Sequence, residues 1–163
     1  MNKGIDKIYN ILDKLNIKYI KHAHEAVYTV EEVNKLQLNI EGQHCKNLFL
    51  RNRKGSIHYL LILCDNKMTD LKSLAKQIES TPLSMASKER LYKYLGLTPG
   101  SVTPFGLIND NNKEVKILID KDLKTDGRIN FHPNTNTSTL TIDYKDFCKF
   151  LNWSGNEIIE VNI

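Results

Sequence analysis

Apolar residues recur along the chain at two spacings, which predict a mixture of helices and strands. Four of them near the start lie three or four positions apart: Ile5, Ile8, Leu12 and Leu15. With Lys and Asp between them, they predict an amphipathic helix that ends at Asn16. A short extended segment at 17–20 should follow. Thr29-Val-Glu-Glu32 has the form of a capping box, so it predicts a second helix in a region that ends at Gly42.

The middle of the chain predicts a hairpin and two further helices. Residues 47–50 and 57–64 should form strands joined by the polar loop 52–55, and the second strand, apolar on both faces, should be central in its sheet. Thr69 or Asp70 should cap a third helix. Ser87 should cap a fourth, which stops at Gly96.

The last third predicts strands and one closing helix. Residues 105–108 and 115–119 should form a second hairpin around the turn at 109–112, and 139–142 another strand. Asp143 should cap a final helix. Hairpins without regular βαβ alternation favour the α+β class. We therefore expect one domain over residues 1–163, with a mixed, largely antiparallel sheet surrounded by helices.

Composition narrows the class of protein. The chain has 163 residues, of which 40% are hydrophobic and 26% charged, which suits one compact domain with a core. Its net charge of +4 comes from a surplus dominated by Lys, and it allows a polyanionic partner without demanding one. No apolar run approaches the ~20 residues of a membrane span, and the N-terminus lacks signal-peptide features. We expect a cytoplasmic protein without membrane contact.

Familiar catalytic and metal-binding motifs are absent from the sequence, including nucleotide-binding glycine loops and the zinc-protease motif. His22 and His24 could share one face of a strand and ligate a metal, but no third ligand has matching spacing. Cys45 lies between His44 and Lys46, and strand neighbours point to opposite faces. A packed thiol is therefore favoured over a nucleophile. The three cysteines are widely spaced and predict neither disulfides nor a zinc site.

Two segments stand out from ordinary scaffold. Residues 97–106 hold two prolines and two glycines between a predicted helix and strand. Pro99-Gly100 fits a turn with positive φ at the glycine, which can direct backbone N–H groups toward an anion, although a plain connecting turn is the simpler interpretation. Residues 130–137 place His132 between Phe131 and a proline. That segment could equally be an ordinary polar loop.

Three sequence blocks together resemble the YbaK/ProX superfamily of aminoacyl-tRNA deacylases, and within it the free-standing prolyl-tRNA editing type. They are Lys46-Asn-Leu-Phe-Leu50, the long block Thr98-Pro-Gly-Ser-Val-Thr-Pro-Phe-Gly-Leu-Ile-Asn-Asp110, and Phe131-His-Pro-Asn134 with its continuation to Thr137. They occur in order and span most of the chain. The resemblance implies the partly barrel-like fold of the YbaK and ProRS editing domains, and no cofactor.

The resemblance also implies a reaction and a site. Members hydrolyse the ester between a wrong amino acid and the 3'-terminal ribose of a tRNA, typically alanine on tRNA(Pro). Activity in the family depends chiefly on the lysine matching Lys46, with Gly100 and His132 in the same site. The expected contacts to the aminoacyl end are Asn47, Ser101, Val102, Thr103, Pro104, Phe131 and Asn134. Contacts to tRNA are expected from Arg51, Arg53, Lys54, Lys88 and Arg90.

The chemistry agrees with the absence of a triad, because an activated ester needs a placed water and a stabilised oxyanion more than a protein nucleophile. Backbone N–H groups near Gly100 and Ser101 could receive the oxyanion while Lys46 holds developing charge. Alternatives remain open: a deacylase for Cys-tRNA(Pro), a tRNA-binding or synthetase-binding module without activity, and a metal-dependent hydrolase. Prolyl-tRNA synthetase is a possible partner.

Overall fold

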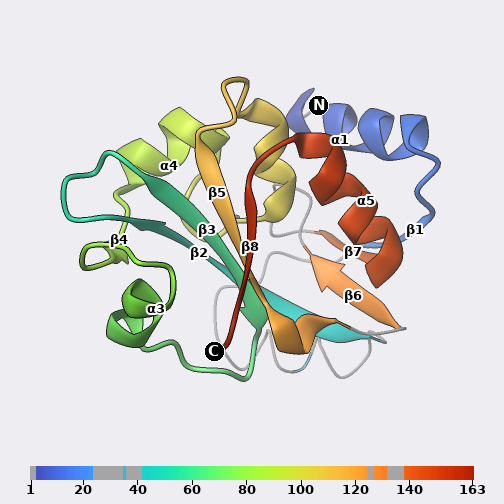
Figure 1. The fold of residues 1–163 in the computed structure, drawn as a ribbon. Helices are drawn as coiled ribbons and strands as arrows, with labels where there is room; N and C mark the ends of the chain where they lie inside the picture. The colour runs from blue at the N-terminus through green and yellow to red at the C-terminus, as the bar shows by residue number, and fades with distance from the viewer. Residues whose placement is uncertain (1–2, 24–34, 36–41, 125–126, 132–137) are drawn as a thin grey trace.

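The computed structural model describes residues 3–23, 35, 42–124, 127–131 and 138–163 (Figure 1). In this part of the chain, strands follow the spatial order β1-β7-β6-β2-β3-β5-β8, and β4 pairs with β2. Their bounds are β1 Tyr19–Ala23, β2 Gln43–Arg51, β3 His58–Cys64, β4 Ser84–Met85, β5 Val115–Asp120, β6 Arg128–Phe131, β7 Ser138–Asp143 and β8 Ile158–Val161. The helices are α1 Lys3–Lys14, α3 Leu71–Gln77, α4 Lys88–Leu95 and α5 Tyr144–Ser154, with 3-10 turns η1 Pro104–Asn109 and η2 Lys121–Leu123.

The sheet is mixed, as the sequence predicts. Antiparallel pairing joins β2 to β3, β2 to β4, β6 to β7 and β1 to β7. Parallel pairing joins β3 to β5, β5 to β8 and β2 to β6. All seven residues of β3 are buried, which confirms the central position expected from its uninterrupted apolar run.

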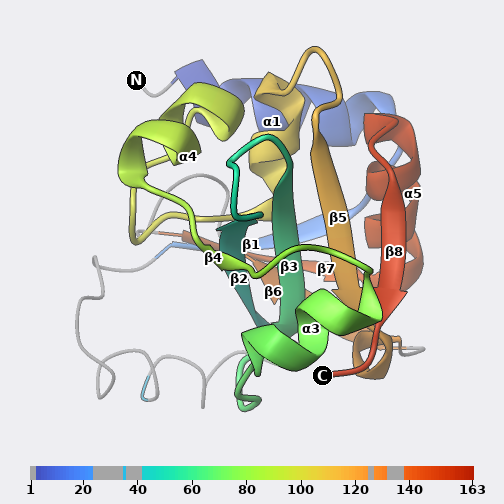
Figure 2. The same ribbon diagram turned by 60° about the vertical axis from the view of Figure 1, so that its left-hand side comes forward.

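The side chains of β3 alternate between two hydrophobic cores, and helices cover both faces of the strand. Leu60 and Ile62 belong to the larger core with α1, α4, η1 and α5, and Leu61 and Leu63 belong to a smaller one with α3. Figure 2 shows α3 in front of the sheet and α1 behind it. None of the described helices has the length and apolar character needed to cross a bilayer.

The predicted helix boundaries are confirmed where the structure describes them. Asp70 accepts hydrogen bonds from the amides of Lys72 and Ser73 at the start of α3. Ser87 caps α4, which ends at Gly96 with a φ of 66°. Asn16, with a φ of 59°, terminates α1. The helix predicted after Thr29 falls outside the described residues, apart from Lys35, which is helical.

The predicted hairpin at 105–119 is wrong in its first half, because residues 104–109 form the turn η1. Pro104 occupies its first position, where a missing N–H costs nothing, and the Thr103 side chain caps it. β5 therefore pairs in parallel with β3 and β8 rather than with a neighbour in sequence. Asp143 precedes α5 as predicted but makes no capping hydrogen bond, and lies 3.6 Å from Arg128 Nε instead.

Candidate active site

One of the two edges of β2 is paired only near its ends. On one side β2 pairs with β3 from Cys45 to Arg51. On the other side it pairs with β6 only at Gln43 and His44, and with β4 only at Leu50 and Arg51. Between these two contacts, β2 has no partner strand in the described part of the chain. Lys46 and Asn47, which open the first of the three sequence blocks, lie in this stretch.

A side-chain hydrogen bond joins this stretch to the second block. Asn47 Nδ2 donates to the carbonyl oxygen of Val102 over 3.3 Å. The Oδ1 atom of the same amide is buried and has no hydrogen-bond partner among the described residues. Asn47 thus fixes the loop between α4 and η1 against the strand, and it still offers a buried acceptor.

The loop contains the turn that the sequence predicts. The amide of Ser101 donates to the carbonyl of Thr98 over 3.1 Å, and Gly100 has a φ of +90°. Gly100 is exposed, and a Cβ built on it would meet no atom of the described residues within 4 Å, so open space adjoins it. The Ser101 amide is not available to an oxyanion, because the turn itself uses it. Of the two N–H groups expected to donate to the oxyanion, the Gly100 N–H remains, and it has no acceptor among the described residues.

The rest of the second block serves mainly as scaffold. Thr103 and Pro104 are buried, and Ser101 and Val102, which precede them, are half-buried. Asn109 Nδ2 donates to the carbonyl of Leu95 and so holds the end of α4.

Asp110, the last residue of the block, is held by hydrogen bonds within the fold. It accepts from the Glu114 and Val115 amides and, over 2.7 Å, from Asn156 Nδ2. These bonds connect the end of the block to the start of β5 and to Asn156, which follows α5.

Lys46 is half-buried and lies opposite Leu63 in the β2–β3 pair. Because successive side chains on a strand point to opposite faces, Lys46 lies on the face of Leu48, and Asn47 lies on the face of the Val102 loop. The two residues therefore flank the unpaired stretch of β2 from its two sides. The flexible four-carbon stem of lysine suits a cation that must reach past a strand edge.

The third block begins beside this stretch. β6 runs parallel to β2, with Asn130 level with His44, and its described part ends at Phe131. Phe131 is 2% exposed and packs between Phe147, at 4.6 Å, and Phe105, at 6.1 Å. Phe131 is therefore packed in the core at the end of β6. His132 and Asn134 lie outside the described residues.

A cysteine nucleophile finds no support in the geometry. Burial raises the pKa of the Cys45 thiol, and the nearby Cys64 and Asp65 raise it further. The geometry also gives no support to a metal site at His22, since its Nε2 atom lies 3.2 Å from the hydroxyl oxygen of Thr141. Within the described ranges, no three His, Cys, Asp or Glu residues are grouped as metal ligands would be.

The basic residues differ in how freely their charges are presented. Arg90 Nη1 donates to the carbonyl of Gly55 over 2.9 Å and lies 3.0 Å from Nε2 of His58. Arg90 thus fixes the β2–β3 hairpin. Lys54 and Lys88 are exposed, and Arg51 and Arg53 lie at the same hairpin.

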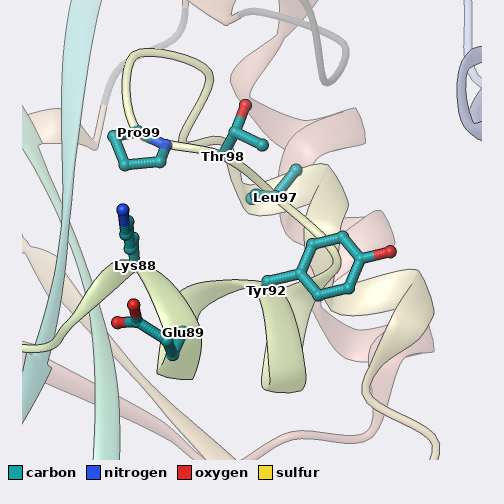
Figure 3. Close-up of a pocket in the computed structure, with 6 residues that line it drawn as sticks. All are labelled: Lys88, Glu89, Tyr92, Leu97, Thr98 and Pro99. Carbon is teal, nitrogen blue, oxygen red and sulfur yellow. The ribbon is translucent and has the colours of Figure 1, made fainter.

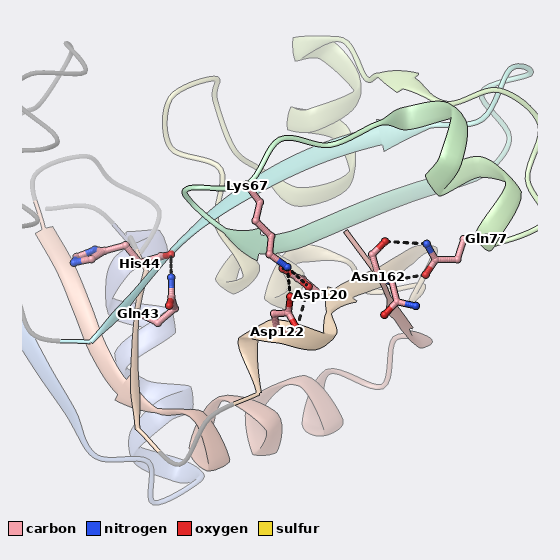
Figure 4. A network of polar contacts seen from close by, with 7 residues as sticks. All are labelled: Gln43, His44, Lys67, Gln77, Asp120, Asp122 and Asn162. Carbon is pink, nitrogen blue, oxygen red and sulfur yellow. Dashed lines mark hydrogen bonds and ion pairs between the residues drawn. The ribbon is translucent and has the colours of Figure 1, made fainter.

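Lys67 is an example of a cation already neutralised within the fold (Figure 4). Its Nζ lies 2.9 Å from the buried Asp120 and 2.5 Å from Asp122, and the hydrogen bond to Asp122 raises the pKa of Lys67. The same view shows Gln77 paired with Asn162, which ties α3 to the end of the chain. Charge counts from sequence include such residues, so they overstate the cations available to a polyanion.

Tyr92 is an exposed aromatic residue on α4 beside the Gly100 loop, and the sequence analysis does not single it out. Helical spacing from Lys88 could have identified it, because residues four apart share a helix face.

The comparisons with known proteins point in one direction. A model of the aminoacyl-tRNA editing domain matches residues 24–150. The prolyl-tRNA editing protein ProX of Acetoanaerobium sticklandii is 43% identical over 145 residues, covering 89% of this chain and 88% of that protein. The prolyl-tRNA synthetase associated domain-containing protein 1 of Bos taurus is 32% identical over 143 residues, covering 85% of this chain and 83% of its own length. A crystal structure of "a putative trans-editing enzyme for prolyl tRNA synthetase" has the same fold, with a TM-score of 0.73 at 17% identity over 100% of this chain and 99% of that one.

Proposed function

Because this chain belongs to the aminoacyl-tRNA editing domain family, we propose that it hydrolyses mischarged Ala-tRNA(Pro) in trans, releasing alanine and free tRNA. The reaction is ester hydrolysis: water attacks the carbonyl carbon, and the terminal ribose oxygen leaves with a proton. A relative named as a prolyl-tRNA editing protein supports tRNA(Pro) as the substrate class.

One observation carries the proposal: the hydrogen bond from Asn47 Nδ2 to the Val102 carbonyl. It joins the strand that holds Lys46 to the loop that holds Gly100. The third block starts beside the same unpaired stretch of β2, at the end of β6. Three segments far apart in sequence thus meet where β2 is left unpaired.

The chain's own groups suit a reaction without a protein nucleophile. Lys46, as a protonated amine, would hold a phosphate or the developing negative charge near the terminal ribose. The Gly100 N–H would donate to the carbonyl oxygen, which becomes the oxyanion. His132 would orient the substrate or the water.

Selectivity for alanine over proline would come from size. A site that accepts a methyl side chain can exclude a pyrrolidine ring by clash, whereas it excludes something smaller far less sharply. The half-buried Ser101 and Val102 are the candidate walls, fixed in place by Asn47.

The test is release of amino acid from Ala-tRNA(Pro), with Pro-tRNA(Pro) and Cys-tRNA(Pro) in parallel, for the wild type, Lys46→Ala and the control Lys72→Ala. Lys72 is an exposed lysine on α3, outside the site. We expect rapid loss of alanine alone in the wild type and in Lys72→Ala, and little turnover in Lys46→Ala with an unchanged melting temperature.

The other outcomes are informative. Faster loss of cysteine than alanine would assign the Cys-tRNA(Pro) specificity instead. Wild-type turnover in Lys46→Ala would remove that lysine from the mechanism. Binding of tRNA(Pro) without cleavage of any ester would favour a binding module, which would associate with tRNA or with prolyl-tRNA synthetase.

A further inference from the structure

A hollow of about 400 Å³ lies between α4 and the segment that follows it (Figure 3). It is lined by Lys88, Glu89 and Tyr92 from α4 and by Leu97, Thr98 and Pro99 from the segment that follows. Its volume falls in the range of about 300–1,000 Å³ that is typical of small-molecule sites.

The hollow adjoins the candidate active site through one turn. Pro99 lines it, and the next residue, Gly100, stands beside open space. Two residues further on, the Val102 carbonyl accepts the Asn47 hydrogen bond. A ligand in the hollow would therefore contact the same loop that Asn47 fixes to β2.

The lining has the chemistry of a nucleotide site. Tyr92 is 68% exposed and, in the described residues, has no ring partner, whereas Tyr94 two positions on packs against His58 at 4.2 Å. Lys88 lies one helical turn before Tyr92, so both are on one face of α4. Figure 3 shows the Lys88 amine extending toward Pro99, with the Tyr92 ring on the other side of the view.

Aromatic faces beside cations bind single-stranded nucleic acid, because each base offers a face for stacking and each phosphate a negative charge. Among the described residues of the lining, Glu89 is the one acidic group. A carboxylate repels phosphate but accepts hydrogen bonds from the exocyclic amino groups of adenine and cytosine or from ribose hydroxyls. The mixture fits a whole nucleotide better than it fits free phosphate.

We propose that this hollow binds one nucleotide of a single-stranded RNA 3' end, with the base stacked on Tyr92 and its phosphate near Lys88. The inference rests on the proposed function for its choice of RNA. It adds an anchor that holds the strand while the terminal ester reaches the unpaired stretch of β2.

Binding is tested with an RNA tetranucleotide ending in CCA and carrying no amino acid, measured by calorimetry. Tyr92→Ala should weaken its binding about 5- to 100-fold, the loss of one stacked base, while Tyr92→Phe keeps it. Lys88→Ala should lower the salt slope by about one, and the control Lys72→Ala should not. In the wild type, the RNA should shift the Tyr92 ring resonances and leave those of Tyr144 in place.

Turnover provides the second measurement. Tyr92→Ala should raise KM for the charged tRNA by a similar factor and leave kcat unchanged, because stacking remote from the ester stabilises ground state and transition state alike. Unchanged RNA affinity and KM in Tyr92→Ala would overturn the subsite and leave the proposed hydrolysis standing. Tyr92-dependent binding of the uncharged RNA, with no ester cleaved, would overturn the hydrolysis and leave the subsite.

Discussion

The Nε2 atom of His58 lies 3.0 Å from Nη1 of Arg90, and the His58 ring is stacked with that of Phe49 at 5.5 Å. The guanidinium can only donate, so the imidazole accepts and is neutral. Burial, followed by the charge of Arg90, lowers the pKa of His58 to about 4. A histidine that stays neutral within the fold links stability to pH.

That link predicts acid sensitivity. Between about pH 6.5 and pH 4 the unfolded chain protonates His58 and the folded one does not, so the free energy of unfolding falls with decreasing pH. The expected contribution is on the order of 2 kcal/mol. Urea unfolding at pH 7 and pH 4.5 measures it, with His58→Gln as the comparison, since glutamine accepts from Arg90 but does not titrate. Equal losses in the two proteins would show that other groups cause the effect.

Asn47→Asp should remove the hydrogen bond that holds the Gly100 loop to β2, with almost no change in side-chain volume. A carboxylate cannot donate to the Val102 carbonyl, and its charge would lie close to that oxygen. We expect kcat/KM for deacylation to fall at least about tenfold, with a stability loss of about 1–3 kcal/mol from the lost bond. Deacylation kinetics and thermal unfolding would separate the two effects. Full activity would mean that the loop is held by other contacts.

Two glycines of the second block should respond differently to alanine. At Gly106 a Cβ would lie 2.7 Å from Leu97 Cδ1 and 3.1 Å from Leu95 Cβ, so Gly106→Ala should cost about 1–3 kcal/mol through overpacking. At Gly100 the space is open and only the backbone φ of +90° opposes a side chain. Gly100→Ala should therefore destabilise less and reduce activity more. Denaturant midpoints and turnover rates compare the pair; the reverse ranking would contradict this assignment.

Cys45→Ser should retain deacylase activity. The half-buried Cys45 thiol has a raised pKa, so little thiolate is present at neutral pH, and the proposed reaction uses water as the nucleophile. Iodoacetamide should likewise inactivate the protein slowly. Rapid alkylation of Cys45 with parallel loss of turnover would instead point to a thiol mechanism.

Local patterns predicted the elements whose cause is local. The apolar run of β3, the Asp70 cap of α3 and the Ser87 and Gly96 boundaries of α4 are all confirmed. Residues 105–108 were misassigned because a short apolar run does not separate a strand from a turn of helix. Pro104 after Thr103 was the available signal, since a proline at the first position with a capping threonine before it favours a helical turn.

The parts that sequence did not predict depend on pairing between distant segments. β6 has four residues and pairs in parallel with β2. Ile129 and its partner Gln43 lie 86 positions apart in the sequence. β8, another short strand, pairs with β5. The resemblance predicts Lys46 and Gly100 as site residues, and only the structure shows that the Ser101 amide is used within its own turn and that Phe131 is packed in the core.

The unpaired stretch of β2 should also leave a signature in amide hydrogen exchange. The amide of Asn52 donates to Ile57, and that of Asp65 to His44, so even-numbered residues of β2 direct their main chain toward β3. The Phe49 carbonyl, which accepts from Ala86, faces the other way, and alternation turns Asn47 the same way. The Asn47 amide should thus exchange faster than its neighbours Lys46 and Leu48. Slower hydrogen exchange of that single amide when aminoacylated RNA binds would show that the substrate lies along the unpaired stretch of β2.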